Sequence, residues 1–354
     1  MTAIELMGTS QQVVWGMTSI QFFFMVQVAA ACIGLAAAQR LVARQALEPY
    51  AGVGLFLGLG LAVTAPLNLI LELHQPLRFL SMLYRTHLTS PLSWGVFILL
   101  GFMLVSASFA LVVLRQKLAT AGPNNLDRSS SGGGVQMLAL LTLLAAALIF
   151  LYSSMDLAAV KGRGLWHSSI VPVVFICSAL AAATGLSGLF AMLVKRLNQE
   201  RLTLLRGWLG FFLTLQLFAQ VLWFLIAFVF GDSFGRFAFD YILAAGFGNF
   251  IVLGLGGTIL LPLVLLYLAR SSRLLFALAA LLSLAGAYLV RWNVIITGQQ
   301  LPRTGTALLP FAPEWWGQGG LLQALAPLAL WILLMILATW TGPWKRLVGQ
   351  QQEG

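Results

Sequence analysis

The sequence has 354 residues, of which 60% are hydrophobic and only 8% are charged, and its formal net charge is +10. A soluble domain carries about a quarter of charged residues, so this composition excludes an ordinary soluble protein and indicates a protein covered by lipid. In a soluble domain, such a large positive net charge would suggest a nucleic-acid partner. Here the positive-inside rule accounts for the charge, so no nucleic-acid binding is expected.

Nine stretches of about 20 mostly apolar residues follow one another along the chain, each long enough to cross a bilayer. They predict an all-α polytopic membrane bundle that forms a single integral-membrane domain over residues 1–354. Glycines gather in the second and seventh stretches, where small residues favour close helix packing. The predicted spans are 13–38, 51–72, 92–114, 136–155, 168–194, 203–230, 245–268, 273–297 and 320–341.

Basic residues are shared unequally between the two sets of loops. One set holds thirteen Lys and Arg residues and the alternate set holds six. Basic residues are retained in cytoplasmic loops, so the richer set is predicted to face the cytoplasm. The N-terminus is then outside and the C-terminus inside, in a bacterial inner membrane. Residues 1–12 contain no Lys or Arg, so no cleavable signal peptide is expected.

Polar residues inside membrane spans are costly unless they are paired or functional, so their distribution is informative. In the predicted orientation most of them lie in the outer third of the bundle. Thr64, Asn68 and Glu72 share one face of the second span because they are spaced by four residues. The other polar or aromatic residues at this end are Thr18, Gln21, His74, Ser90, Ser93, Trp94, Tyr152, Asp156, Trp166, His167, Arg291, Asn293 and Gln299.

Each of these positions also has a structural interpretation. Carboxylates, His, Tyr and Trp at span ends are common interfacial residues. Thr18 and Gln21 would serve only to form hydrogen bonds between helices. Arg291 is charged and lies inside a span, and its structural role would be an ion pair with Glu72 or Asp156. The buried amides interpreted as interhelical hydrogen bonds are Gln27, Gln216 and Gln220.

A quinone suits the outer polar region. Its ring and tail need an apolar slot, and its carbonyl oxygens need hydrogen-bond donors. Its redox reaction also moves two protons, so a carboxylate or a His must reach water. The residues predicted to handle protons are Glu72, His74 and Asp156. The residues predicted to hold the quinone are Thr18, Gln21, Trp94, Tyr152 and Arg291.

No residue set in the sequence suits a haem or a bound metal. Cys32 and Cys177 both lie inside apolar spans, and no CxxC motif occurs. The three His residues, His74, His87 and His167, lie in loops or at span ends, so a haem held by paired His ligands in mid-membrane is not expected. Electrons would therefore pass directly between a quinone and a redox centre in a partner subunit at the outer face.

Several segments resemble the NrfD-like polysulfide reductase membrane subunits. Residues 72–79 read ELHQPLRF and residues 89–95 read TSPLSWG. The family shows an acidic-Leu-Gly-Arg-Pro-x-Arg-Phe turn and then a Ser-Pro-Met-Ser-Trp-Gly entry to the next helix. His74 and Gln75 stand where Gly and Arg are usual. Residues 152–175 and 291–299 are similar as well, so the resemblance covers about residues 13–300.

This resemblance implies a subunit that exchanges electrons between exchangeable menaquinol or ubiquinol and a four-cluster, ferredoxin-like iron–sulfur protein. That protein would serve a molybdopterin catalytic subunit. The family's quinone site lies near the outer face, with polar residues of the first helix and a Tyr of the fourth, and Gln21, Thr18 and Tyr152 occupy similar places here. Nine spans favour a branch similar to the tetrathionate reductases.

Two other functions remain open at this stage. A secondary transporter would show inverted repeats and broken helices near mid-membrane, and no convincing repeat is found. A membrane anchor would hold a soluble enzyme without a quinone site of its own. Transport by the isolated protein would indicate the first alternative, and failure to bind a quinone analogue would indicate the second.

Overall fold

The computed structural model describes residues 13–42, 45–73, 75–85, 91–119, 133–160, 163–230, 233–268, 272–301, 309–317 and 319–340. These residues form helices and connecting segments without any strand. A helix satisfies its backbone N–H and C=O groups internally, which lipid cannot do. In chain order the elements are α1 (Met17–Val42), η1 (Gln45–Tyr50), α2 (Val53–Glu72), η2 (Pro76–Leu80), α3 (Ser81–Tyr84), α4 (Pro91–Ala119), α5 (Gly133–Ala158), α6 (Val171–Leu193), α7 (Gln199–Phe230), α8 (Ser233–Ala244), η3 (Gly248–Leu260), α9 (Leu261–Leu268), α10 (Arg273–Gln300) and α11 (Leu321–Trp340).

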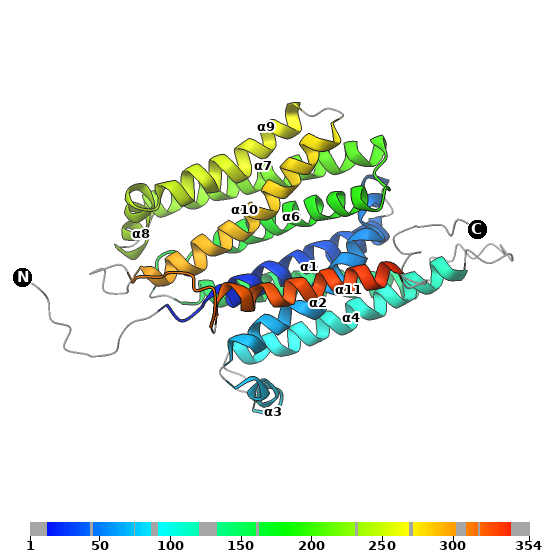
Figure 1. Cartoon of the computed structure of the whole chain (residues 1–354), viewed down its shortest axis with the longest axis horizontal. Helices are drawn as coiled ribbons and strands as arrows, with labels where there is room; N and C mark the ends of the chain where they lie inside the picture. The colour runs from blue at the N-terminus through cyan, green and yellow to red at the C-terminus, as the bar shows by residue number, and fades with distance from the viewer. Residues whose placement is uncertain are drawn as a thin grey trace, which may run out of the picture.

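Within these described segments, nine helices are long and apolar enough to cross a membrane, with η3 and α9 forming one continuous span. The predicted fold class and number of spans are therefore confirmed. Figure 1 shows the helices side by side along the long axis of the molecule. Some helices exceed their predicted limits, because a helix can continue beyond the hydrocarbon core into the headgroup region. For example, α4 ends at Ala119 and α5 begins at Gly133.

The two ends of the bundle differ in character. We call the site end the one at which α1, α4, α6 and α11 begin and α2, α5, α7 and α10 end. The short helices α3 and α8 also lie at this end (Figure 1). The opposite end, the basic end, carries Arg40, Lys117, Arg196 and Arg201. The site end corresponds to the predicted outer face, and the orientation in the membrane stays a prediction.

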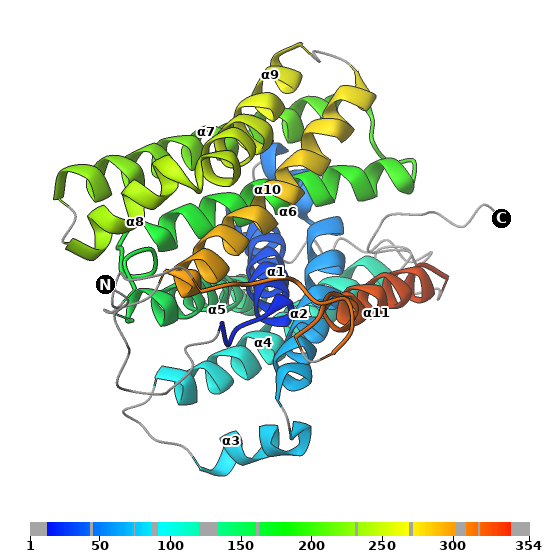
Figure 2. The same cartoon turned by 60° about the vertical axis from the view of Figure 1, so that its left-hand side comes forward.

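The spans divide into two bundles that meet along α1. The first bundle contains α1, α2, α4 and α5, with α11 packed on α2, and the second contains α6, α7, η3–α9 and α10. Helix α1 contacts α6 and α10 as well as its own bundle, and it lies near the centre of the molecule in Figure 2. In the most apolar stretch of each span, 89% of the α1 residues are buried but only 22% of the α4 residues. Helix α1 is therefore a core element enclosed by the other helices.

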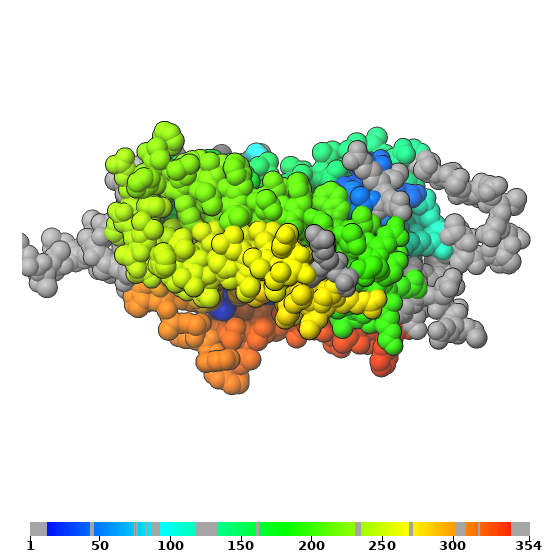
Figure 3. Space-filling model, turned by 90° about the horizontal axis from the view of Figure 1, so that it is seen from above, coloured from blue at the N-terminus to red at the C-terminus, as the bar shows by residue number. Residues whose placement is uncertain are grey.

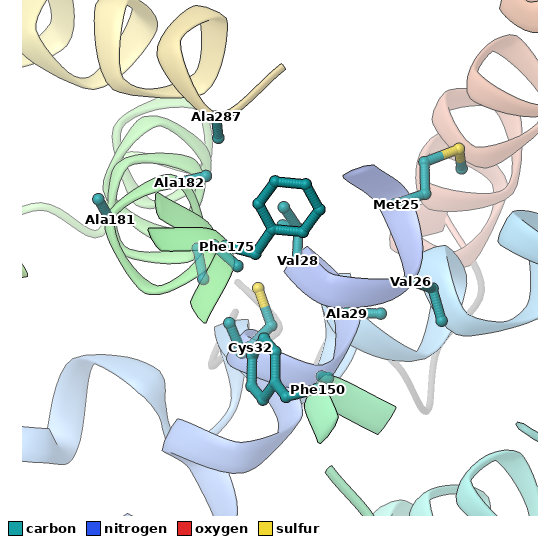
Figure 4. Close-up of a cluster of buried hydrophobic side chains, with 14 of the residues drawn as sticks. Met25, Val26, Val28, Ala29, Cys32, Phe150, Phe175, Ala181, Ala182 and Ala287 are labelled. Atoms are coloured by element: carbon teal, nitrogen blue, oxygen red, sulfur yellow. The ribbon is translucent and has the colours of Figure 1, made fainter. Parts of the chain in front are cut away.

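Small residues allow the helices to approach α1 closely. Figure 4 shows Val28 and Ala29 of α1 among Phe150, Phe175 and Ala182, which come from α5 and α6. A Cβ atom added at Gly58 of α2 would fall 2.6 Å from Ile33 Cγ1. This agrees with the predicted packing role of the α2 glycines. Cys32 and Cys177 are both buried as free thiols.

The second bundle contains an unusual backbone. Element η3 is a π-helix of 13 residues, whereas π-helical hydrogen bonding is mostly confined to single turns. Among the described atoms, a Cβ added at Gly256 or Gly257 would come within 4 Å only of the carbonyl oxygen five residues earlier in the same helix. The predicted packing role against another helix is therefore wrong for these two glycines. Figure 3 shows the face that α7, α8 and η3–α9 present, with α10 at its edge.

Candidate functional site

The start of α1 is held by three elements that lie far away in the sequence. The Val14 and Trp15 N–H groups donate to Gln299 Oε1 of α10, at 3.0 and 2.9 Å. The Gly16 N–H donates to Glu72 Oε1 at 3.2 Å, and the Met17 N–H donates to the Gly319 carbonyl oxygen at 3.0 Å. The first N–H groups of a helix have no partner within the helix. Here α2 and the segment before α11 supply partners to the Gly16 and Met17 N–H groups, and α10 binds the two residues just before the helix.

The Glu72 carboxylate is the charged group nearest to this helix start. Its Oε2 atom accepts a hydrogen bond of 2.5 Å from the Ser19 hydroxyl. Thr18 lies beside the same carboxyl group, although its hydroxyl oxygen has no partner with hydrogen-bond geometry. A negative charge is favourable at a helix N-terminus because the helix dipole is positive there. Glu72 therefore stabilises the start of α1, and each carboxylate oxygen keeps a second lone pair.

At the site end of the first bundle, three buried polar atoms have no hydrogen-bond partner among the described residues. They are Thr18 Oγ1, Gln21 Nε2 and Asn68 Oδ1, in residues that are 0%, 4% and 0% exposed. Thr18, Gln21 and Met25 share one face of α1, since they are spaced by three and four residues. Asn68 Nδ2 lies 3.5 Å from Met25 Sδ, so this face meets α2. Such unsatisfied groups cost about 1–3 kcal/mol each, which makes them candidates for binding a ligand.

Tyr152 of α5 packs against the backbone of α4. A Cβ atom at Gly95 would fall 2.0 Å from the Cζ and Oη atoms of Tyr152, so only glycine leaves room for this ring. The glycine of the Ser-Trp-Gly motif thus explains how Tyr152 is placed. The preceding residue, Trp94, is 56% exposed at the surface of the bundle.

Asp156 lies one turn beyond Tyr152 toward the site end, close enough to interact with it electrostatically. Its partly buried carboxylate forms no hydrogen bond with any residue in the described segments. Helix α1 packs against both α2 and α5, and Gln27 Nε2 donates to Ser153 Oγ at 2.8 Å. The Glu72 group and the Tyr152 group therefore flank the same helix at the same end. Predicted residues His74 and Ser90 lie outside the described residues.

Arg291 occupies a different place from the other predicted site residues. It is fully buried at the junction of the two bundles. Its donors reach Gln27 Oε1, Ser178 Oγ and three backbone carbonyl oxygens, and its guanidinium lies over the Phe24 and Phe175 rings. The ion pair expected with Glu72 or Asp156 is wrong, because all of these partners are neutral. A guanidinium has five N–H groups, and five acceptors surround it, so Arg291 joins the bundles.

The sequence interpretation missed how the site end is closed. Trp15 stacks on Trp166 with ring centroids 5.3 Å apart. Trp166 Nε1 donates to the Val294 carbonyl oxygen at 2.7 Å, and Arg163 covers its ring. Gln299 was noted only as an outer polar residue, yet it binds the backbone of residues 14 and 15. No sequence signal links these partners, because they are brought together by the packing of α10 against α1.

The comparison with known protein families decides the family of this bundle. The family described as "Polysulphide reductase, NrfD" matches residues 5–303. The chain belongs to the NrfD family. This confirms the resemblance carried by the turn after α2 and the Ser-Trp-Gly entry to α4.

Three curated relatives of this NrfD protein are subunits of reductases. The C subunit of tetrathionate reductase from Salmonella typhimurium is 26% identical over 94% of this chain and 93% of that protein. A putative membrane C subunit of dimethyl sulfoxide reductase from Halobacterium salinarum is 25% identical over 81% of this chain and 69% of that protein. The C chain of polysulfide reductase from Wolinella succinogenes is 26% identical over 67% of this chain and 80% of that protein. The protein is therefore a multi-pass membrane protein similar to the C subunits of reductase complexes.

Proposed function

We propose that this NrfD protein is the membrane subunit of a respiratory oxidoreductase in a bacterial inner membrane. It binds menaquinol or ubiquinol at the site end of the first bundle, on the outer side of the membrane. Electrons pass between the quinol and an iron–sulfur subunit docked at that end. That subunit connects the protein to a molybdopterin catalytic subunit, as the NrfD resemblance implies.

The observation that carries this proposal is the set of unpartnered polar atoms on the α1–α2 face. Among the described residues, Thr18 Oγ1, Gln21 Nε2 and Asn68 Oδ1 have no hydrogen-bond partner, and Thr18 lies beside the Glu72 carboxyl group. A hydroxyl or amide donor suits a quinone carbonyl oxygen, and an acceptor suits a quinol hydroxyl group. The chemistry of these groups therefore fits a quinone or quinol headgroup.

The first bundle also offers groups that can take up protons. Oxidation of one quinol to quinone releases two protons and two electrons, and both kinds of particle must leave the site. Glu72 of α2 and Asp156 of α5 carry carboxylates at the site end of the first bundle, and each is partly exposed. We assign proton transfer to them and hydrogen bonding of the headgroup to Gln21, Thr18 and Tyr152. His74 and Trp94 complete the proposed set.

The experiment uses the complete complex in membranes, with a short-chain quinol as donor and reduction of the partner's iron–sulfur centres as readout. Tyr152→Phe removes one hydroxyl group, and Glu72→Gln removes the charge while keeping the size. We expect about a 100-fold slower reduction in Glu72→Gln, the size typical of a lost proton-transfer group. Tyr152→Phe loses one hydrogen bond to the headgroup, and we expect a reduction roughly 5- to 10-fold slower. Tyr288→Phe, a matched variant in α10, is expected to keep the wild-type rate.

Three results would contradict the proposal. Normal assembly with unchanged rates in Tyr152→Phe and Glu72→Gln would exclude this site. Failure of the first-bundle face to bind a quinol analogue would favour a membrane anchor. Transport of a solute by the isolated protein in vesicles would favour a secondary transporter.

A further inference from the structure

A second set of unpartnered polar atoms lies in the second bundle. Gln216 Nε2 and Gln220 Oε1 of α7 and Asn293 Oδ1 of α10 are buried and have no hydrogen-bond partner among the described residues. All three residues are 2% exposed. The interhelical hydrogen bonds predicted for Gln216 and Gln220 are absent at these atoms. Amide side chains without partners inside a membrane bundle are costly, so a ligand is expected to satisfy them.

These amides meet the π-helix η3. Asn293 Nδ2 donates to the Asn249 carbonyl oxygen at 3.1 Å. A Cβ atom at Gly254 would lie 3.8 Å from both Asn293 Nδ2 and Gln220 Nε2. Gly254 therefore marks the point where α7, η3 and α10 converge. We call Gln216, Gln220, Asn293 and the backbone of 249–254 the amide cluster.

The hydrogen-bonding atoms of the amide cluster limit which ligand can bind there. One unpartnered atom is an N–H donor and two are carbonyl acceptors, so the ligand must both accept and donate hydrogen bonds. A metal cation only accepts lone pairs and would leave the donor unsatisfied. No carboxylate, His or Lys belongs to the cluster, so it lacks the proton-accepting group that quinol oxidation needs. Water matches this requirement, since a buried water makes about three hydrogen bonds to polar groups.

We propose that the amide cluster is a water-binding site that is connected to the site end along α10. Asn293 and Thr297 lie one turn apart on the face of α10 that Gly286 presents to Thr258 of η3. Gln300 continues this face to the end of the helix. Thr297 and Gln300 therefore provide polar groups between the amide cluster and the aqueous phase. This site is separate from the quinol site of the first bundle.

Water at this place has a physical consequence for Arg291. Arg291 precedes Asn293 by two residues on α10, and its fully buried charge has only neutral partners. A buried charge is less costly where the surroundings are more polarisable. Bound water within one turn of α10 would supply that polarisability from the second bundle.

The test measures the access of water to single cysteines in the assembled complex. The natural thiols are removed as Cys32→Ala and Cys177→Ala, and Asn293→Cys or Thr297→Cys is introduced. The matched control is Val294→Cys, because Val294 is equally buried and neighbours Asn293 but lies on another face of α10. Membranes are treated with Ag⁺, a small water-borne thiol reagent, and are then denatured and labelled with a polymer-linked maleimide.

We expect Ag⁺ to protect the new thiols of Asn293→Cys and Thr297→Cys from maleimide labelling several-fold more strongly than the thiol of Val294→Cys. Equal protection at all three positions would overturn the proposal. So would protection by lipid-soluble N-ethylmaleimide but not by Ag⁺, because that result would mean access from the lipid.

A density map of the unaltered complex gives an independent measurement if the cysteine variants do not assemble. Ordered density within hydrogen-bond distance of Gln220 Oε1 and Asn293 Oδ1 is expected. Empty space there, or the continuous density of an acyl tail, would overturn the proposal. Gln220→Leu is expected to keep quinol oxidation unchanged, so the outcome here is independent of the quinol assignment.

Discussion

The two bundles bury similar numbers of unpartnered polar atoms, but they surround them with different chemistry. In the first bundle Thr18, Gln21 and Asn68 lie near Glu72, and Tyr152 lies near Asp156. In the described part of the second bundle the unpartnered atoms belong to three amides and to the Ser187 hydroxyl of α6. An amide can orient a ligand but does not change its protonation near neutral pH. The comparison teaches what separates the proposed quinol site from the amide cluster, namely a titratable group beside the buried polar atoms.

The largest effect is expected where one added methyl group displaces the Tyr152 ring. In Gly95→Ala the new Cβ would overlap the phenol, so the ring must move by more than about 1 Å, a displacement that can cost about 100-fold in rate. Quinol-driven reduction of the partner's clusters measures this loss. The control is Gly101→Ala on the same helix, where no atom lies within 4 Å of the new Cβ. Equal rates in the two variants would show that the position of Tyr152 is unimportant.

The same substitution in each bundle separates a satisfied amide from an unsatisfied one. Gln27 accepts from Arg291 and donates to Ser153, so Gln27→Leu removes a hydrogen bond to a charged group and should cost about 2 kcal/mol. The unfolding temperature of the complex should fall by roughly 4–8 °C. Gln220→Leu should lower it by much less. A larger loss in Gln220→Leu would reverse the comparison.

Gln299→Leu tests the closure of the site end. The variant leaves the Val14 and Trp15 N–H groups without their shared acceptor, and we expect a loss of about 1–2 kcal/mol. Faster hydrogen exchange at these amides is the direct readout. Gln300→Leu is the control, since within the described segments its side chain donates to the Leu309 carbonyl oxygen at 3.4 Å and not to residues 14 and 15. Unchanged exchange in Gln299→Leu would contradict the described contact.

The smallest effect is expected at the basic end, where Glu48 of η1 and Arg201 of α7 also join the two bundles. Their side chains lie 2.7 Å apart and are 46% and 32% exposed. Exposed ion pairs contribute about 0–1 kcal/mol, so Glu48→Gln should change the unfolding temperature by no more than roughly 2–4 °C. The change should vanish in high salt. A salt-independent effect as large as that of Gln27→Leu would mean that this pair dominates the junction.

The sequence was sufficient for the fold class, because length and hydropathy determine which segments cross a bilayer. The spacing of Thr64, Asn68 and Glu72 also placed them on one face of α2, and Asn68 and Glu72 do meet α1. The partners of Arg291 could not be predicted, because a guanidinium can donate hydrogen bonds to any nearby carbonyl, hydroxyl or carboxylate group. The π-helix was missed as well, because its glycines give the same sequence signal as helix packing.

The hydrogen bonds at the start of α1 also constrain how the protein is made. The acceptor for the Trp15 N–H is synthesised 284 residues later, which takes roughly 15–60 s at a typical elongation rate of about 5–20 residues per second. The segment before α11 is completed later still. Ribosome-bound nascent proteins that lack α10 would insert α1 into the membrane while the Val14 and Trp15 N–H groups just before it are unpaired. The proposed quinol site would therefore be one of the last parts of the nascent protein to mature.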